Sequence, residues 1–246
     1  MNEVLRSLKE RKSIRAFEPL PIPAEVKREI LLAAMEAPTA GNQQLYTLLD
    51  ITDPALKAQL AETCDHQPFI AQAPMAVIFC ADVQKWVDVF ETGGAQPRSP
   101  GAGDLLLAVA DALIAAQNAV VAAQSLGVGS CYIGDIMEQC ETHRQLLNLP
   151  DYVFPAALVV FGYPTSQQLA RPKPQRCRLE DIVQTNRYIR RDEAQLRRMF
   201  EKETRGRSFE MWSQAFCQRK YNSDFSREMT RSAEVYLQAF RRGEKD

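Results

Sequence analysis

The spacing of apolar and polar residues predicts helices in the first part of the chain. Residues from about Asn2 to Glu10 place their apolar side chains on one face of a short helix. A second helix is expected from about Pro23 to Ala37, because Pro23 suits the first helical turn and Pro38 marks a stop. A further helix is expected from Glu138 to Leu149.

Short apolar runs bounded by breaker residues are typical of buried strands. Four segments fit this description, the last of them as a short strand end: Tyr46 to Thr52, Met75 to Ala81, Ala156 to Phe161, and Cys131 to Ile133. The glycine-rich segment from Thr92 to Gly103 is predicted to be a loop, either a mobile lid or a surface connection.

The longest apolar stretch runs from Asp104 to Leu126. Polar residues interrupt it, among them Asp111 and Asn118, and each would be costly in hydrocarbon. It is therefore predicted to be a long helix of a soluble protein that ends at Gly127 and Gly129 and is buried on most sides. Two environments remain open: the core of a monomer, or a core that also packs across a two-fold dimer interface.

The order of these elements favours a sheet covered by helices on both faces. No G-x-G-x-x-G follows a strand, which disfavours a dinucleotide-binding Rossmann fold. From Asp192 to Arg242 the sequence predicts charged amphipathic helices with aromatic anchors, which should pack onto the body of the protein. We expect a main domain at residues 1–190 and a helical extension at residues 191–246.

Composition narrows the class of function. A formal net charge of −1 gives no general attraction to nucleic acid or to acidic membranes. The six cysteines form no C-x-x-C pair, and neither histidine has ligand-like spacing, so no metal site is expected. The charged N-terminus has no apolar signal core, and we expect a cytoplasmic protein with reduced thiols.

Two basic segments could bind an anion. The first, RKSIR, holds three cations and a hydroxyl within five residues: Arg11, Lys12, Ser13 and Arg15. Guanidinium groups can bind phosphate oxygens in pairs, although such clusters are more often solvated helix ends. The second, RPKPQRCR, is stiffened by prolines and carries the cations Arg171, Lys173, Arg176 and Arg178; by itself it could equally be a linker.

Two further segments could bind a flat polar ring. APTAGNQQ, residues 37–44, combines small residues with amide donors and acceptors. LGVGSCYIGDI, residues 126–136, contains Gly134, which could bring its backbone N–H close to a planar ligand. Each segment alone is more often an ordinary polar loop or a glycine turn.

Taken in order, these segments resemble the nitroreductase/flavin reductase superfamily. Gln67 in DHQPFIAQAP, FCAD, GYP and ETRGRSFEMW extend the match over nearly the whole chain. The chain is most similar to the larger NADPH-dependent, oxygen-insensitive nitroreductases with a helical C-terminal extension. This resemblance implies an α+β fold with a mixed, mostly antiparallel sheet between helical layers, and an FMN-binding homodimer.

The resemblance also implies roles for individual residues. Arg11, Lys12, Ser13 and Arg15 would hold the FMN phosphate and ribityl chain, with Lys173 and Arg176 as later partners. Other FMN contacts would come from Thr39, Asn42, Gln67, Ile133, Gly134 and Asp135. The backbone N–H groups of Gly134 and Asp135 would face the flavin N5 and O4 region. Arg205, assisted by Arg207, would bind the 2′-phosphate of NADPH.

The implied activity is NAD(P)H-dependent reduction of flat acceptors such as nitroaromatics or quinones, with hydride passing through FMN and no catalytic side chain. Asp135 departs from the family pattern, because that position is often glycine. Three alternatives stay open: a flavin reductase that supplies reduced FMN to a partner, a flavin-binding sensor without turnover, and a helical interaction protein without a cofactor.

Overall fold

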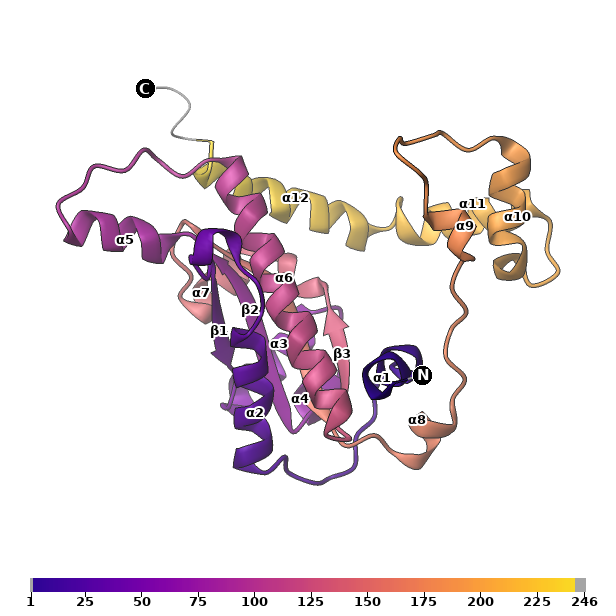
Figure 1. Ribbon diagram of the computed structural model, residues 1–246, viewed down its shortest axis with the longest axis horizontal. Helices are drawn as coiled ribbons and strands as arrows, with labels where there is room; N and C mark the ends of the chain where they lie inside the picture. Colours follow the sequence, from indigo (N-terminus) through magenta and orange to yellow (C-terminus); the bar gives the residue numbers. More distant parts are fainter. Residues whose placement is uncertain (1, 242–246) are drawn as a thin grey trace. The chain divides into compact units, whose positions relative to one another are not determined.

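In the computed structural model, which describes residues 2–241, four strands form one sheet in the order β1-β2-β4-β3 (Figure 1). Every neighbouring pair is antiparallel. The strands are β1 (Tyr46–Asp50), β2 (Met75–Asp82), β3 (Gly129–Ile133) and β4 (Val153–Gly162). The two central strands, β2 and β4, are buried along their whole length, which explains why their sequences are continuously apolar rather than alternating.

Helices supply most of the remaining structure. They are α1 (Glu3–Glu10), α2 (Ala24–Met35), α3 (Pro54–Thr63), α4 (Phe69–Gln72), α5 (Gln84–Thr92), α6 (Ala102–Ser125), α7 (Cys140–Leu147), α8 (Ser166–Ala170), α9 (Leu179–Ile182), α10 (Glu193–Thr204), α11 (Phe209–Lys220) and α12 (Asp224–Ala239). Two 3₁₀ turns, η1 (Ala40–Asn42) and η2 (Asp135–Met137), follow α2 and β3. The sequence predicted α1, α2, α6, α7 and the helical tail, but not α3, α4, α5, α8 or α9.

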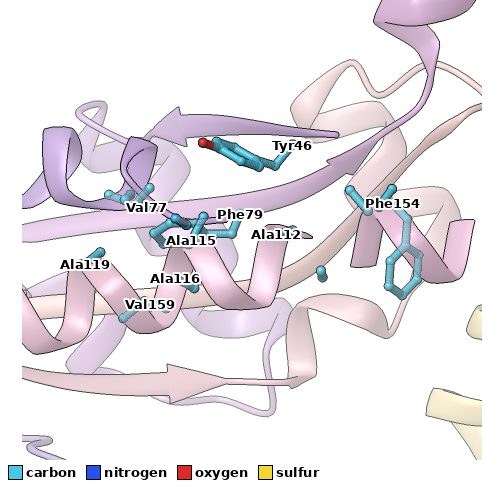
Figure 2. Packing of buried hydrophobic residues seen from close by; sticks show 14 of the residues in the cluster. Tyr46, Val77, Phe79, Ala112, Ala115, Ala116, Ala119, Phe154 and Val159 are labelled. Atoms are coloured by element: carbon cyan, nitrogen blue, oxygen red, sulfur yellow. The ribbon is translucent and has the colours of Figure 1, made fainter. Parts of the chain in front are cut away.

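Helices cover both faces of the sheet, as expected for this α+β class. On one face, α2 and α6 cover the buried side chains that β2 and β4 direct to that side of the sheet. On the other face α3 and α4 bury Leu60 and Ile70 against Ile78 and Leu158. Figure 2 shows four alanines of α6 on the side that faces the central strands: Ala112, Ala115, Ala116 and Ala119. Alanine on this face lets the helix axis lie close to the sheet.

The C-terminal end of α6 agrees with the sequence. Gly127 adopts a left-handed φ of 74°. Its N–H donates to the Gln124 carbonyl, and the N–H of Val128 donates to the Ala123 carbonyl at 2.8 Å. This pair of hydrogen bonds is the Schellman motif, which satisfies carbonyl groups that the end of a helix leaves free.

The burial of α6 differs from the expectation. One face is buried, but Leu106, Leu107, Leu113 and Ile114 are exposed, Leu106 by 70%. The helix is also long and apolar enough to cross a membrane by length and composition. Its buried face, however, carries Asp111 and packs on a sheet, as in the core helix of a soluble fold. The expectation of burial on most sides was wrong for the single chain.

The chain forms two compact units. The first unit contains residues 2–172 and 228–241, and the second contains residues 173–227. Helix α12 is fixed in the first unit by Tyr236 and Phe240, whose rings meet Phe154 and Tyr152 edge-on at 5.0 and 5.4 Å. Residues 242–246, the last part of the expected tail, lie outside the described residues.

Two glycines bring the segment after α1 against the edge of the sheet. Ser13 forms a parallel bridge with Ser130 of β3, which makes the pairing mixed, and Phe17 bridges Pro164. A Cβ atom on Gly129 would lie 2.7 Å from the Ile14 side chain, and one on Gly162 would lie 2.6 Å from the Phe17 ring. Gly129 was expected to end α6; it instead begins β3, and its missing side chain leaves room for Ile14.

Replacement of Gly129 by Ala should therefore destabilise the fold by about 1–3 kcal/mol, because Ile14 and Pro164 have to move. Gly103→Ala is the matched control, since a Cβ there meets no atom within 4 Å. Its effect should stay within about 0.5 kcal/mol. Urea unfolding of both variants checks the prediction, and equal midpoints would show that Ile14 does not need the space.

Candidate functional site

The basic cluster, defined here as Arg11, Lys12, Ser13 and Arg15, lies along the outer edge of β3. Arg11 ends α1, and its extended backbone carries the chain directly onto the strand. The N–H of Ile14 donates to the Ser130 carbonyl at 2.9 Å, so the cluster is fixed by sheet pairing. The residues of this cluster were predicted from the sequence, and the structure adds the strand that positions them.

The side chains of the cluster are held to different degrees. Lys12 donates to the carbonyls of Leu169, at 2.6 Å, and Arg171. Arg171 itself donates to the Ser13 carbonyl at 2.8 Å. By contrast, Nη1 of Arg11 is buried and has no hydrogen-bond partner within residues 2–241. A buried donor on a cation is costly to leave unpaired, so the position fits an anion.

The pKa of the Cys131 thiol responds to the positive charge at this edge of the sheet. Burial raises its pKa, while Arg15 and Arg11 act in the opposite direction because their charges favour the thiolate. Arg11 also opposes the burial that raises the pKa of Tyr132 to about 12. Both guanidinium groups therefore act on the same strand, and Arg171, which the sequence assigned to the other basic segment, joins them.

The loop at residues 39–45, called the amide loop below, contains Thr39 and Asn42. Thr39 donates its hydroxyl proton to the buried Asp111 of α6 and accepts from the N–H of Gln44 at 2.7 Å. The Asn42 side chain is exposed, on a residue with a left-handed φ of 56°. Asn42 is thus available to a ligand, whereas the Thr39 hydroxyl is engaged within the protein.

Gln67, Ile133, Gly134 and Asp135 lie at the end of β3 and at the turn between α3 and α4. Gln67 donates to the carbonyl of Cys64 at 2.8 Å. Burial raises the pKa of the Cys64 thiol, and the negative charge of Asp135 raises it further. Because Gln67 is hydrogen-bonded to Cys64 and Asp135 acts on its thiol, Gln67 and Asp135 lie near the same residue. A Cβ on Gly134 would meet only the end of Met137 at 3.7 Å, so the chain's own packing does not require glycine there.

Glu138, which follows η2, was missed by the sequence analysis. It is 6% exposed, and its Oε1 has no hydrogen-bond partner in the described part of the chain. Burial raises the pKa of Glu138 to about 7, with further increases from Asp135, Asp65 and Glu228. Close to neutral pH this carboxyl therefore exchanges a proton beside the turn that contains Asp135.

The second unit carries the remaining predicted residues. Arg205 has a left-handed φ of 51° and ends α10; with Gly206 and Arg207 it makes an exposed turn. Arg176 lines a cavity of about 640 Å³ inside this unit. Its lining combines cationic and aromatic residues with three acidic ones: Arg178, Arg198, Lys202, Trp212 and Phe216 with Asp181, Glu201 and Glu203. Lys173 is the first residue of the unit.

Substitution of Glu138 by Gln should change the pH dependence of stability. The folded carboxyl keeps its proton up to about pH 7 and the unfolded one up to about 4.5, so the folded chain binds more protons between these values. In the wild type, the contribution of Glu138 to the free energy of unfolding therefore falls as the pH rises through this window. Relative to wild type, Glu138→Gln should gain on the order of 1–3 kcal/mol between pH 5 and pH 8.

Urea unfolding at the two pH values measures this gain. Glu141→Gln is the control, because Arg231 lowers the pKa of that exposed carboxyl and pairs with it at 2.9 Å. Its loss should lower stability slightly at both pH values. If the free energy of unfolding changed equally with pH in Glu138→Gln and in the wild type, Glu138 would already be ionised at pH 5.

Comparisons with known proteins agree with this arrangement. The sequence matches the Nitroreductase family over residues 8–163. It is 32% identical to FMN reductase [NAD(P)H] of Bacillus subtilis over 236 residues, covering 88% of this chain and 90% of that protein. It is also 32% identical to the oxygen-insensitive NADPH nitroreductase of Salmonella typhimurium over 201 residues, 80% of each chain.

A solved structure extends the likeness to the whole fold. The oxidoreductase YcnD of Bacillus subtilis superposes with a TM-score of 0.80 at 30% identity, covering 96% of this chain and 98% of that one. The matched residues 8–163 include the basic cluster, the amide loop, Gln67 and the turn at Gly134. On sequence and fold together, this chain belongs to the nitroreductase family.

Proposed function

We propose that this chain is an FMN-dependent NAD(P)H oxidoreductase that reduces flat organic acceptors. The observation that carries the proposal is the buried Nη1 of Arg11, which has no hydrogen-bond partner within residues 2–241, at a sheet edge already crowded with cations. The names of the Bacillus and Salmonella relatives agree with it. A dianionic phosphate would satisfy this donor and balance the charge of Arg15 and Arg171.

The site residues divide by the part of FMN that they would hold. Arg11, Ser13 and Arg15 would bind the phosphate, with Lys12 completing the cluster and Lys173 and Arg176 as later partners. Asn42 and Gln67 would contact the ring or ribityl chain through their amides, beside Thr39 and Ile133. The open space at Gly134 lets a ring approach the backbone, whose N–H groups at Gly134 and Asp135 would stabilise negative charge near N5 and O4.

Bound FMN would supply the redox chemistry, taking hydride from NAD(P)H and passing electrons to the acceptor. The protein binds and orients the reactants, and no side chain is needed as a catalytic acid or base. One relative's name favours free flavin as the acceptor, and the other's favours a nitro compound. Comparing kcat/KM for free FMN and for a nitroaromatic separates these two activities.

We also propose that the chain acts as a homodimer. The exposed leucines of α6 form an apolar surface, and α1 carries three more apolar residues that are each over 40% exposed: Val4, Leu5 and Leu8. In the second unit Asp181 alone is buried, while Leu179 and Tyr188 are 76% and 84% exposed. Such surface is more than a monomer usually leaves in water, and a second copy would cover it. A monomer by sedimentation at micromolar concentration would contradict this.

A cytoplasmic location is part of the proposal. All six cysteines are free thiols, and four of them are buried in the core of the first unit. Unpaired cysteines fit a reducing compartment, where NADPH is also available. The acceptor is then expected to be a small molecule rather than a nucleic acid or a membrane.

The absorbance spectrum of the purified protein tests the function directly. We expect the two visible bands of an oxidised flavin, which should bleach when NADPH or NADH is added without oxygen. Bands that persist after both additions would indicate a flavin-binding protein without turnover. A colourless protein that takes up no FMN would contradict the proposal.

Replacement of both Arg11 and Arg15 by Ala should weaken FMN binding by at least about 100-fold, since two charged hydrogen-bond partners of the phosphate are lost. The FMN dissociation constant, followed by flavin fluorescence, measures the effect, and the dimer should weaken in parallel. Arg28→Ala is a matched control, because Arg28 is an exposed cation on α2. Equal flavin content in all three proteins would reject the phosphate assignment.

Arg205→Ala should raise KM for NADPH by about 10- to 100-fold and change KM for NADH little, because only NADPH carries the 2′-phosphate. Arg207→Ala should have a smaller effect, since its Nε already donates to the Thr204 carbonyl at 3.2 Å. Steady-state kinetics with both cofactors provide the comparison. An equal rise for NADH and NADPH would exclude recognition of the 2′-phosphate by Arg205.

A further inference from the structure

A single buried carboxylate holds the amide loop from both ends. Asp111 lies in the middle of α6 and is 3% exposed. Its oxygens accept the N–H of Ala40 at 3.0 Å, the N–H of Leu45 at 3.2 Å and the hydroxyl of Thr39. Thr39 and Ala40 begin the loop and Leu45 ends it, so these bonds close the loop across its base.

The chain between these ends has an unusual backbone. Gly41, Asn42 and Gln44 have left-handed φ values of 57°, 56° and 49°. Residues other than glycine adopt this region at a cost, and they keep it where the surroundings fix the conformation. The ends of the loop are tied down, while Asn42 and Gln44 are exposed. The shape of the exposed part therefore depends on the contacts at the base.

Asp111 is not explained as half of an ion pair. No cation forms a salt bridge with it in the described part of the chain, and its hydrogen-bond partners there all belong to the amide loop. Burying a charge in this way is costly unless every oxygen is hydrogen-bonded. A carboxylate can only accept hydrogen bonds, and each of the three groups bonded to Asp111 donates one. An asparagine would direct an NH₂ group at one of these donors.

A second set of contacts supports the loop from α5. The indole N–H of Trp86 donates to the Gln43 carbonyl at 2.9 Å, and Nζ of Lys85 donates to the Gln44 carbonyl at 2.8 Å. These bonds fix the carbonyls of the loop, whereas Asp111 fixes its N–H groups. The two anchors act on different atoms, so loss of Asp111 should release the base without detaching the loop entirely.

We infer that Asp111 is a positioning residue that sets the loop shape in which Asn42 meets the ring of a bound flavin. The inference rests on the proposed function, and it assigns Asp111 to the ring side of the site. The basic cluster serves the phosphate side. Loss of Asp111 should therefore weaken binding of FMN and of riboflavin, which lacks the phosphate, by the same factor.

The experiment compares Asp111→Asn with two other proteins. Asn118→Ala is the matched control, because Asn118 lies on the same helix and donates to the Ala33 carbonyl of α2 at 3.2 Å, away from the loop. The Arg11→Ala/Arg15→Ala protein reports on the phosphate side. FMN and riboflavin are titrated separately into each full-length, flavin-free protein, and amide hydrogen exchange is measured over residues 38–46.

The expected results differ between the proteins. Asp111→Asn should weaken both flavins by at least about tenfold and speed exchange at residues 38–46. Asn118→Ala should change both affinities by no more than about twofold. The double arginine variant should weaken FMN alone. Asp111→Asn with wild-type affinity for riboflavin, or with unchanged exchange in the loop, would overturn the inference.

A second pair of variants decides the matter if Asp111→Asn fails to fold. Thr39→Val removes the hydroxyl that links Asp111 to Gln44, and Thr39→Ser keeps it. Thr39→Val should speed amide exchange at residues 38–46 and weaken both flavins, whereas Thr39→Ser should keep the slow exchange of the wild type; equal exchange in the two variants would overturn the inference. If the wild type binds neither flavin, the proposed function fails, while hydrogen exchange still tests whether Asp111 holds the loop.

Discussion

The close packing of α6 on the two central strands is the contact on which the rest of the structure depends. Its buried face is mostly alanine, so the helix backbone lies near the sheet, and Asp111 on that face reaches the amide loop directly. A larger side chain at Ala112 or Ala115 would push the helix outward and separate Asp111 from its donors. The same packing leaves the leucines of the opposite face exposed for a second subunit. The core helix thereby couples the core, the binding loop and the proposed dimer contact.

The two ends of β3 have opposite electrostatic character. Near its start, Arg11, Arg15 and Arg171 gather where the first segment of the chain pairs with the strand. Beyond its end, Asp135 and Glu138 meet Asp65 and Glu228, and their mutual repulsion adds to burial in keeping a proton on Glu138. A phosphate suits the first end, whereas negative charge developing at the second would be opposed while Glu138 is ionised. If the flavin ring binds at this turn as proposed, its reduction should depend on whether Glu138 is protonated.

The sequence predicted structural features that are set by contacts between residues close in sequence. It missed those set by contacts between residues far apart in the chain. The end of α6 was predictable because Gly127 and its hydrogen-bond partners lie within a few residues. Gly129 was misassigned because the side chain that needs its space, Ile14, lies far earlier in the chain. Asp111 was recognised only as a polar interruption, since its partners Thr39 and Leu45 are 72 and 66 residues away. Arg171 was grouped with its sequence neighbours for the same reason. Helix α3 was missed because its apolar residues form no clear stripe.

If the chain is a homodimer and binds NADPH as proposed, the second unit would link subunit assembly to cofactor choice. It holds Arg205 and Arg207, the residues proposed to read the 2′-phosphate, yet Asp181 is the one residue that it buries among those described. None of its apolar residues is buried, although Phe200 stacks on Trp212 at 5.3 Å, so its own contacts offset only part of the entropy of ordering its chain. Both of its ends are tied to the first unit, the second through α12, which Glu228 fastens to the N–H of Gln139 at 3.0 Å. A surface that covers Leu179 and Tyr188 would give the unit the apolar burial that it lacks by itself. If that surface belongs to a second copy, the preference for NADPH over NADH is a property of the dimer, and dilution to monomers should remove it.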